Sequence, residues 1–168
     1  TLNGGTISGA GTFSVTGDFT QAATSVVSAP VLLGGAAANV SQTTGGTLGN
    51  VTVTATGNKS ITSTDLTLSS LTVTSTGGIV CSTTCTMHLS GNYTQTAGTA
   101  TVGTGGTISF EGAASQTFNR TVGTFNPNII VDKTGGALTL SSAMTLVSGS
   151  DLTIANASSI LNLAGQNL

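Results

Sequence analysis

Apolar and hydroxyl side chains alternate along much of the chain. The clearest runs are VTVT at 51–54, ITST at 61–64 and LTVT at 71–74. Because successive side chains of a strand point to opposite faces, this alternation predicts short β-strands that bury Val or Leu and present Thr outward. No segment places apolar residues at helical spacing over several turns, so we expect no helix.

A longer internal similarity overlies this alternation. TFSVTGDFTQ at 12–21 is matched by TMHLSGNYTQ at 86–95, and further short matches follow in the same order. Such similarity is the signature of repeat architectures. It predicts a single domain, residues 1–168, that contains two internal copies at about 12–74 and 86–154.

Short strands separated by Gly, Asn and Ser are typical of a β-sandwich or a β-solenoid. The repeat favours an all-β fold in the form of a parallel β-solenoid (β-helix), with a β-sandwich as the alternative. Coils of about 20 residues, stacked ~4.8 Å apart, would number about eight. The side chains expected to be buried are Val51, Val53, Leu66, Leu68, Leu71 and Val73, with their counterparts Ile129, Val131, Met144, Leu146, Leu152 and Ile154.

Charge is scarce. Only 5% of the residues are charged, and the formal net charge is −2, whereas about 25% of residues are charged in an average domain. The chain therefore lacks the positive field that binds nucleic acid or anionic lipid, and no apolar run is long enough to span a membrane. No charged-then-apolar leader precedes Thr1, so we expect the numbering to begin after processing or within a longer chain.

Three segments carry a family resemblance: SGNYTQTAGTATVGTGGTISFEGAASQTF (90–118), NIIVDKTGGALTLSSAMTL (128–146) and DLTIANASSILNLAGQNL (151–168). In composition and order they resemble the Gly/Thr/Ser/Asn-rich tandem repeats of large bacterial surface and secreted proteins, which are adhesin-like. The resemblance implies a β-solenoid at an extracellular or cell-surface location. It does not indicate a ligand.

The two cysteines, Cys81 and Cys85, are spaced CSTTC. In an extracellular chain this pair predicts a local disulfide. Because the loop falls between the two copies, we expect it to decorate a turn and to be dispensable for the fold. His88 follows without further Cys, His or carboxylate nearby in the sequence, so no metal site is predicted, and its parity with Thr86 and Ser90 predicts a solvent-facing side chain.

The remaining candidate chemistry does not predict an enzyme. Glycoside hydrolysis needs two carboxylates about 5–10 Å apart, but the acidic residues occupy unlike repeat positions, and Asp132 and Lys133 are expected to form a solvated pair. One His without a GxSxG motif makes no triad. The glycine-rich stretches at 103–106 and 134–136 lack the Lys and helix of a phosphate loop and are expected to be turns. We predict no catalytic residue, no cofactor and no metal.

Six N-x-S/T sequons permit N-glycosylation of an extracellular chain. Their acceptor residues are Asn39, Asn50, Asn58, Asn92, Asn119 and Asn156.

The predicted function is structural. LNLAGQNL at 161–168 and TLNGGTISGAGTF at 1–13 both read as repeat interior without a cap, which favours a subunit or segment of an extracellular surface fibre that stacks end to end. Its partner is then itself, as a head-to-tail homopolymer or as tandem repeats of a longer chain. The alternative is a glycan-binding or cell-surface adhesin module, with surface glycans as the partner.

An ice-binding protein is a further alternative, because Thr-x-Thr rows on a flat face are typical of such proteins. The chain offers the pairs Thr52/Thr54, Thr62/Thr64 and Thr72/Thr74. In the second copy the matching places are Ile130/Asp132 and Leu140, so we do not expect the pattern to persist across coils.

Overall fold

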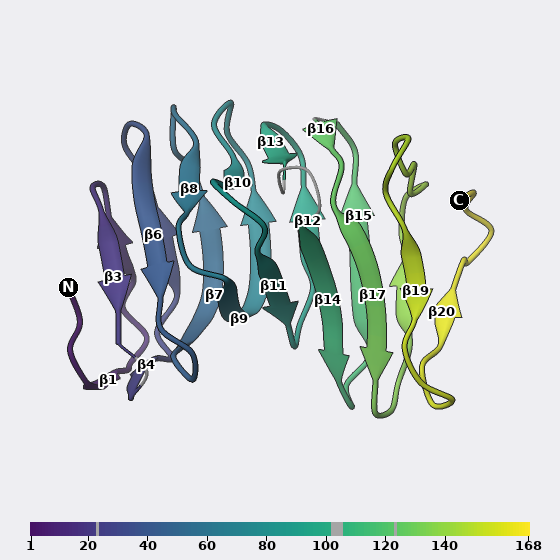
Figure 1. Cartoon of the computed structure of the whole chain (residues 1–168), viewed down its shortest axis with the longest axis horizontal. Coiled ribbons are helices and arrows are strands. Elements are labelled where there is room, and N and C mark those ends of the chain that lie inside the picture. The colour runs from purple at the N-terminus through teal and green to yellow at the C-terminus, as the bar shows by residue number, and fades with distance from the viewer. Residues whose placement is uncertain (23, 102–105, 123) are drawn as a thin grey trace.

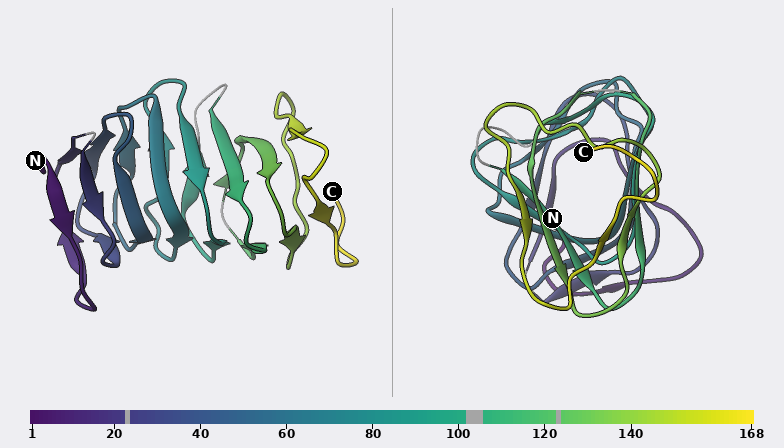
Figure 2. Two further views of the ribbon diagram at one scale, coloured as in Figure 1. Left: turned by 90° about the horizontal axis from the view of Figure 1, so that it is seen from below. Right: turned by 90° about the vertical axis from the view of Figure 1, so that its right-hand side faces the viewer.

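The computed structural model describes the whole chain except residues 23, 102–105 and 123. The chain winds into a parallel β-solenoid of about 7 turns, stacked from the N-terminal to the C-terminal end along its longest axis (Figure 1). Seen end on, each coil is a closed loop around the core (Figure 2). Within the described residues there is no helix, and hence no helix long and apolar enough to cross a membrane.

Each coil contributes up to three strands, which build three faces. Face 1 contains β1 (Gly5–Ile7), β4 (Ser25–Val27), the first half of β7 (Thr47–Val53) and of β9 (Asp65–Val73), β11 (Thr86–Leu89), β14 (Thr107–Gly112), β17 (Asn128–Lys133) and β19 (Leu152–Ile154). Face 2 contains β2 (Phe13–Val15), β5 (Val31–Leu33), the second halves of β7 and β9, β12 (Tyr93–Gln95), β15 (Gln116–Arg120), β18 (Leu138–Leu140) and β20 (Leu161–Asn162). Face 3 contains β3 (Phe19–Gln21), β6 (Ala38–Gln42), β8 (Lys59–Ile61), β10 (Ile79–Cys81), β13 (Thr99–Thr101) and β16 (Thr124–Phe125).

The parallel β-solenoid is therefore confirmed, with about 7 turns instead of about eight. The β-sandwich alternative is wrong, because strands in the described residues pair in parallel, for example β7 with β9 and β14 with β17. Parallel pairs need a long connection between partner strands. Here that connection is the rest of one coil.

Like residues stack on like residues from coil to coil. Val27 pairs with Leu48 and Leu68 with Leu89, and the same step of 21 separates the stacked Gln21 and Gln42. One inward column on face 1 runs through Ile7, Val27, Leu48, Leu68, Leu89, Phe110, Val131 and Ile154. Each inner member of such a column is covered above and below by another apolar side chain, and this removes it from water.

Most of the expected core is confirmed. The expected core residues that are buried are Val51, Val53, Leu66, Leu68, Leu71, Val73, Ile129, Val131 and Met144. Leu146 and Leu152 are only half-buried, and Ile154 is 47% exposed. The expectation of a buried Ile154 is wrong because β19 pairs with β17 on one side and with no other strand of the described residues.

The long-range similarity between the two predicted copies does not coincide with the coil. Phe19 lies in β3 on face 3, whereas its counterpart Tyr93 lies in β12 on face 2. The offset between the copies is not a whole number of coils, so matched segments occupy different faces. The division into two copies stays a prediction, and the stacking unit of the rod is the single coil.

The interior also contains polar side chains, concentrated where the chain turns. Gln42 donates through Nε2 to Gln21 Oε1 over 2.8 Å. Gln21 in turn donates to the backbone oxygens of Ser25, at 2.9 Å, and Thr47, at 2.8 Å. A buried polar group is tolerated when its hydrogen bonds are made. Gln21 thereby bonds to carbonyl groups at the first residues of β4 and β7.

Candidate functional site

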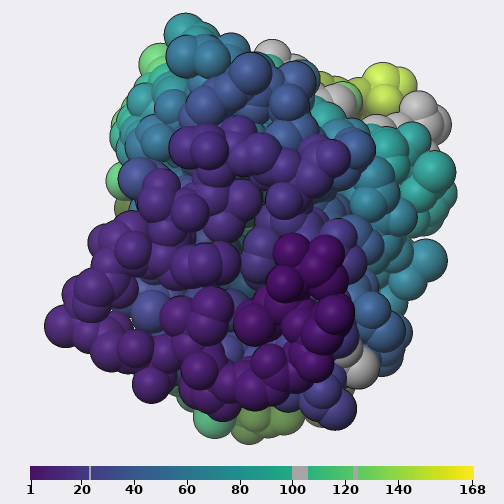
Figure 3. Space-filling model, turned by 90° about the vertical axis from the view of Figure 1, so that its left-hand side faces the viewer, coloured from purple at the N-terminus to yellow at the C-terminus, as the bar shows by residue number. Residues whose placement is uncertain are grey.

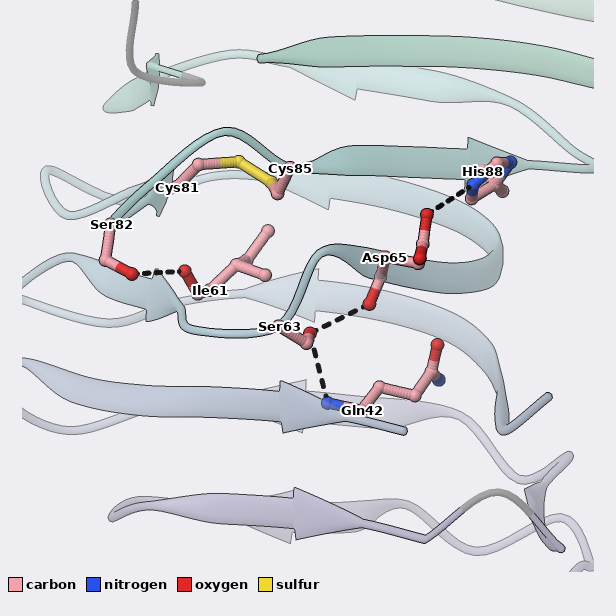
Figure 4. Close-up of a disulfide and its surroundings, with 8 residues drawn as sticks. All are labelled: Gln42, Ile61, Ser63, Asp65, Cys81, Ser82, Cys85 and His88. Carbon is pink, nitrogen blue, oxygen red and sulfur yellow. Dashed lines mark hydrogen bonds and ion pairs between the residues drawn. A yellow bond between two sulfur atoms is a disulfide. The ribbon is translucent and has the colours of Figure 1, made fainter. Parts of the chain in front are cut away.

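A row of ionisable side chains crosses the outer side of face 1. His88 of β11 lies between Asp65, the first residue of β9, and Glu111 of β14. His88 Nδ1 is 2.6 Å from Glu111 Oε1, and His88 Nε2 is 3.2 Å from Asp65 Oδ1. The three side chains are 30–38% exposed. We call Asp65, His88 and Glu111 the acid–histidine row; Figure 4 shows the contact between Asp65 and His88.

Coil geometry explains how these residues meet. Asp65 pairs with Thr86 and His88 pairs with Ser109, so each member of the row lies two residues further along its strand than the one before. Side chains two residues apart share a face and are diagonal neighbours across adjacent strands. The available sequence signal was the equal spacing of 23 between Asp65, His88 and Glu111, which is the coil step of 21 plus two.

The prediction that His88 faces outward is confirmed, with the qualification that it is half-buried. The expectation that the acidic residues occupy unlike positions is wrong for Glu111 and Asp132, which are paired on β14 and β17. Asp65 and Glu111 lie two coils apart and are linked through His88 between them. Asp132 extends the acidic surface, because it pairs directly with Glu111 and accepts a 2.5 Å hydrogen bond from Asn156 Nδ2.

The two carboxylates strengthen the binding of a proton by the imidazole. Partial burial acts to lower the pKa of His88, but the hydrogen bonds and negative charges of Glu111 and Asp65 outweigh it, and the pKa is raised above its ordinary value. Both ring nitrogens are engaged by carboxylates, so neither is placed to take a proton from a nearby serine. The row is therefore a clamp across three strands. In the described part of the chain, no group of three or more His, Cys, Asp or Glu side chains is arranged to hold a metal ion.

The two lysines lie inside the coil. Lys133 is 0% exposed, and its Nζ donates to the backbone oxygens of Glu111, at 3.1 Å, and Ala114, at 2.6 Å, and to Gln116 Oε1. Lys59, also 0% exposed, donates to Ala36 O over 2.7 Å.

Burial lowers the pKa of both amines, and at Lys59 the charge of Asp18 partly opposes that effect. The prediction that Asp132 and Lys133 form a solvated pair is wrong. The two residues are adjacent on β17, and strand alternation therefore sends Asp132 outward and Lys133 inward.

The disulfide between Cys81 and Cys85 is present, with the two Cα atoms 5.8 Å apart. It closes the corner between β10 and β11 (Figure 4). The expectation that it merely decorates a turn is wrong, because Cys81 is 8% exposed and Cys85 2% exposed, and both pack in the hydrophobic core. Cys81 holds an inward position of β10, which directs its sulfur to the interior. Its dispensability stays a prediction.

A threonine array covers part of face 2. Thr52, Thr72 and Thr94 are neighbours on three successive coils. Two residues further along, Thr54, Thr74 and Thr96 form a second, exposed row. Thr62 is not part of it, because it follows β8 on face 3. The expectation that the pattern fails across coils is wrong over these three coils: the neighbour of Thr72 in space is Thr94, one coil away, and not its counterpart in the second copy.

The sequon residues differ in exposure. Asn39, Asn50, Asn58 and Asn92 are exposed, whereas Asn119 and Asn156 are half-buried. Two of the exposed side chains are engaged as acceptors: Asn58 Oδ1 binds the Gly78 amide at 3.1 Å and Asn92 Oδ1 binds the Thr117 amide at 2.9 Å. These bonds join successive coils at the corners.

The glycine-rich stretch at 134–136 is a turn, and Gly136 has a φ of 59°, a conformation that favours glycine. Of the other stretch, 103–106, only Gly106 falls within the described residues. A shallow depression of about 190 Å³ lies at the bend of β7, with Leu48, Gly49 and Asn50 on its wall. No ionisable side chain lines it.

No protein-family model, curated protein or solved structure matches this chain.

Proposed function

We propose that this chain is a structural segment of an extracellular fibre, in which solenoids join end to end. The observation that carries the proposal concerns the outermost strands of the described coils. Among the described residues, β1 and β2 pair on one side only, with β4 and β5, and β19 and β20 pair on one side only, with β17 and β18. Unpaired strand edges are templates for further strands.

The C-terminal end also presents apolar side chains. Ile154, Ile160, Leu163 and Leu168 are 47%, 54%, 38% and 57% exposed, although the chain buries most of its other large apolar residues. A further coil placed on β19 would cover Ile154, the last member of an inward column, and burial of apolar area favours association. A head-to-tail contact of this kind propagates into a filament and does not close.

Three features support an extracellular location. Cys81 and Cys85 form a disulfide, and disulfides persist in oxidising compartments. The outer surface is rich in hydroxyl groups and poor in charge, with 5% charged residues. The resemblance to tandem repeats of bacterial surface and secreted adhesin-like proteins points to the same place.

The experiment is to follow assembly of the purified chain by sedimentation at increasing concentration and by negative-stain electron microscopy. We expect particles that lengthen into rods of constant width. Ile154→Lys, which places a charge on the open end, should prevent lengthening, whereas the matched variant Thr153→Lys, on the outward side of the same strand, should assemble normally. A wild-type chain that remains a monomer at high concentration would overturn the proposal and leave a lone adhesive module.

The threonine array favours a second candidate, binding to ice. Neighbouring coils place its hydroxyls ~4.8 Å apart, and residues i and i+2 of a strand lie about 6.7 Å apart, so face 2 carries a regular two-dimensional set of hydroxyl and methyl groups. A crystalline surface such as ice requires a regular array of this kind. Ice-recrystallisation inhibition should then be lost in Thr72→Lys and kept in the matched Thr62→Lys. Equal activity in both variants, or none in the wild type, rejects this candidate.

A further inference from the structure

We propose that the unpaired edges of β19 and β20 receive β1 and β2 of a second copy of this unit, in a fixed register that continues each column of the core. In this register Ile7 of the second copy follows Ile154, and Phe13 lies over the region of Leu161. The inference rests on the proposed end-to-end assembly and adds its partner and its alignment. Figure 3 shows the N-terminal end, where the first coil faces the viewer.

The apolar columns support this register. Ile7 and Phe13 are half-buried because each packs on only one side, against Val27 and Val31 of the next coil. At the other end, Ile154 and Leu161 also pack on one side only, against Val131 and Leu138. Docking would give each of these four side chains the second apolar neighbour that residues inside the stack already have. All strands would remain parallel across the junction, as they are within the chain.

The shape of the coil supports the same partner. Between face 1 and face 2, residues 8–12 form a loop in the first coil and residues 155–160 form a loop in the last. In two middle coils this corner has no loop, because β7 and β9 each run through it as one continuous strand, and the other coils between have three or four residues there. The first and last coils therefore have the two longest loops at this corner. Stacking a looped corner on a looped corner lets the flanking strands of both faces align.

Charge does not oppose the contact. Residues 1–24 contain one ionisable side chain, Asp18, and residues 141–168 contain one, Asp151. Asp18 lies between β2 and β3, whereas Asp151 precedes β19 on face 1. The proposed register therefore keeps the two carboxylates on different faces and places no pair of like charges opposite one another.

Cysteine cross-linking tests the register. Thr6 and Thr153 are exposed and occupy the outward position next to Ile7 and Ile154. Neighbouring strands would bring their Cα atoms to about 4.8 Å, within the range that a disulfide spans. A mixture of the single variants Thr6→Cys and Thr153→Cys, oxidised under assembly conditions, should yield a reducible dimer. The matched mixture of Ser14→Cys, exposed on β2, with Thr153→Cys should yield none. The native cysteines are already joined to each other.

The outcomes separate this inference from the proposed function. If sedimentation shows assembly but the Thr6/Thr153 mixture forms no dimer, the register is overturned and the fibre stands. If Thr6→Cys alone dimerises as well as the mixture, the contact is head to head, which also overturns the register. If the chain neither assembles nor cross-links, both proposals are overturned.

Discussion

At the scale of single residues, the position of a side chain within its strand decides its environment. Asp132 and Lys133 are neighbours in sequence, yet Lys133 is fully buried and Asp132 faces outward beside Glu111. The buried amine is tolerated because backbone carbonyls of a corner accept its hydrogen bonds. Outside, His88 joins carboxylates from the coils before and after its own.

The acid–histidine row predicts that stability depends on pH. The pKa of His88 is raised above its ordinary value of 6.5, so the folded protein binds the proton more tightly than the unfolded chain. The added stability is complete below about pH 6.5 and is lost as the pH rises through the folded-state pKa. Because the groups are partly exposed and screened, we expect a loss of about 1 kcal/mol or less. Denaturant unfolding at a series of pH values from 5.5 to 8.5 measures it.

His88→Gln is the control, since His88 is the one histidine of the chain. The variant should be less stable than the wild type at low pH, and the difference should shrink as the pH rises. High salt should reduce the wild-type slope. A pH profile that is the same in both proteins would show that the row does not clamp the strands.

At the scale of the strand, alternation produces two chemically distinct surfaces from one short sequence. In β9 the inward residues Leu66, Leu68, Leu71 and Val73 are all at most 1% exposed, and the residues between them are half-buried Thr and Ser. Stacking of the same pattern on the next coil turns each inward residue into part of a column. The strand is stable because its neighbours above and below repeat it.

The two surfaces should respond differently to truncation. Leu71→Ala leaves a cavity within a column and should lower the free energy of unfolding by about 2–5 kcal/mol. Thr72→Ala, at the adjacent outward position, should change it by about 1 kcal/mol or less. Denaturant unfolding of the two variants measures both values. Similar losses would mean that the outward face of β9 is also covered, which this fold does not allow.

At the scale of the whole molecule, the solenoid is a column of coils in which each coil is stabilised by its two neighbours. The interior coils are complete in this sense. Among the described residues, the first and last coils have a neighbouring coil on one side only, and Ile7 and Phe13 are accordingly half-buried and Ile154 exposed. The same property that builds the rod therefore leaves two surfaces on which it can continue, and both proposals on assembly follow from it.

The sequence by itself determined the class of fold and most of the core. Alternation is a local property, so inward residues such as Val51, Leu71 and Val131 could be assigned without knowing their neighbours. The outward orientation of His88 followed in the same way, and the CSTTC spacing together with the expected extracellular location predicted that Cys81 and Cys85 pair. The absence of helical periodicity excluded the helical fold classes, whereas the β-sandwich was excluded only by the parallel strand pairing.

Only the tertiary structure decided which residues stack on one another. Alternation and the expected coil of about 20 residues did not fix the register between coils, so Asp65, His88 and Glu111 were interpreted as isolated. Thr94 likewise was not recognised as the neighbour of Thr72. An alternating strand fixes which way a side chain points, but contacts between strands depend on the length of every corner between them. A small change in the length of one corner shifts the register of each later strand pair. The register is therefore fixed only in the folded solenoid.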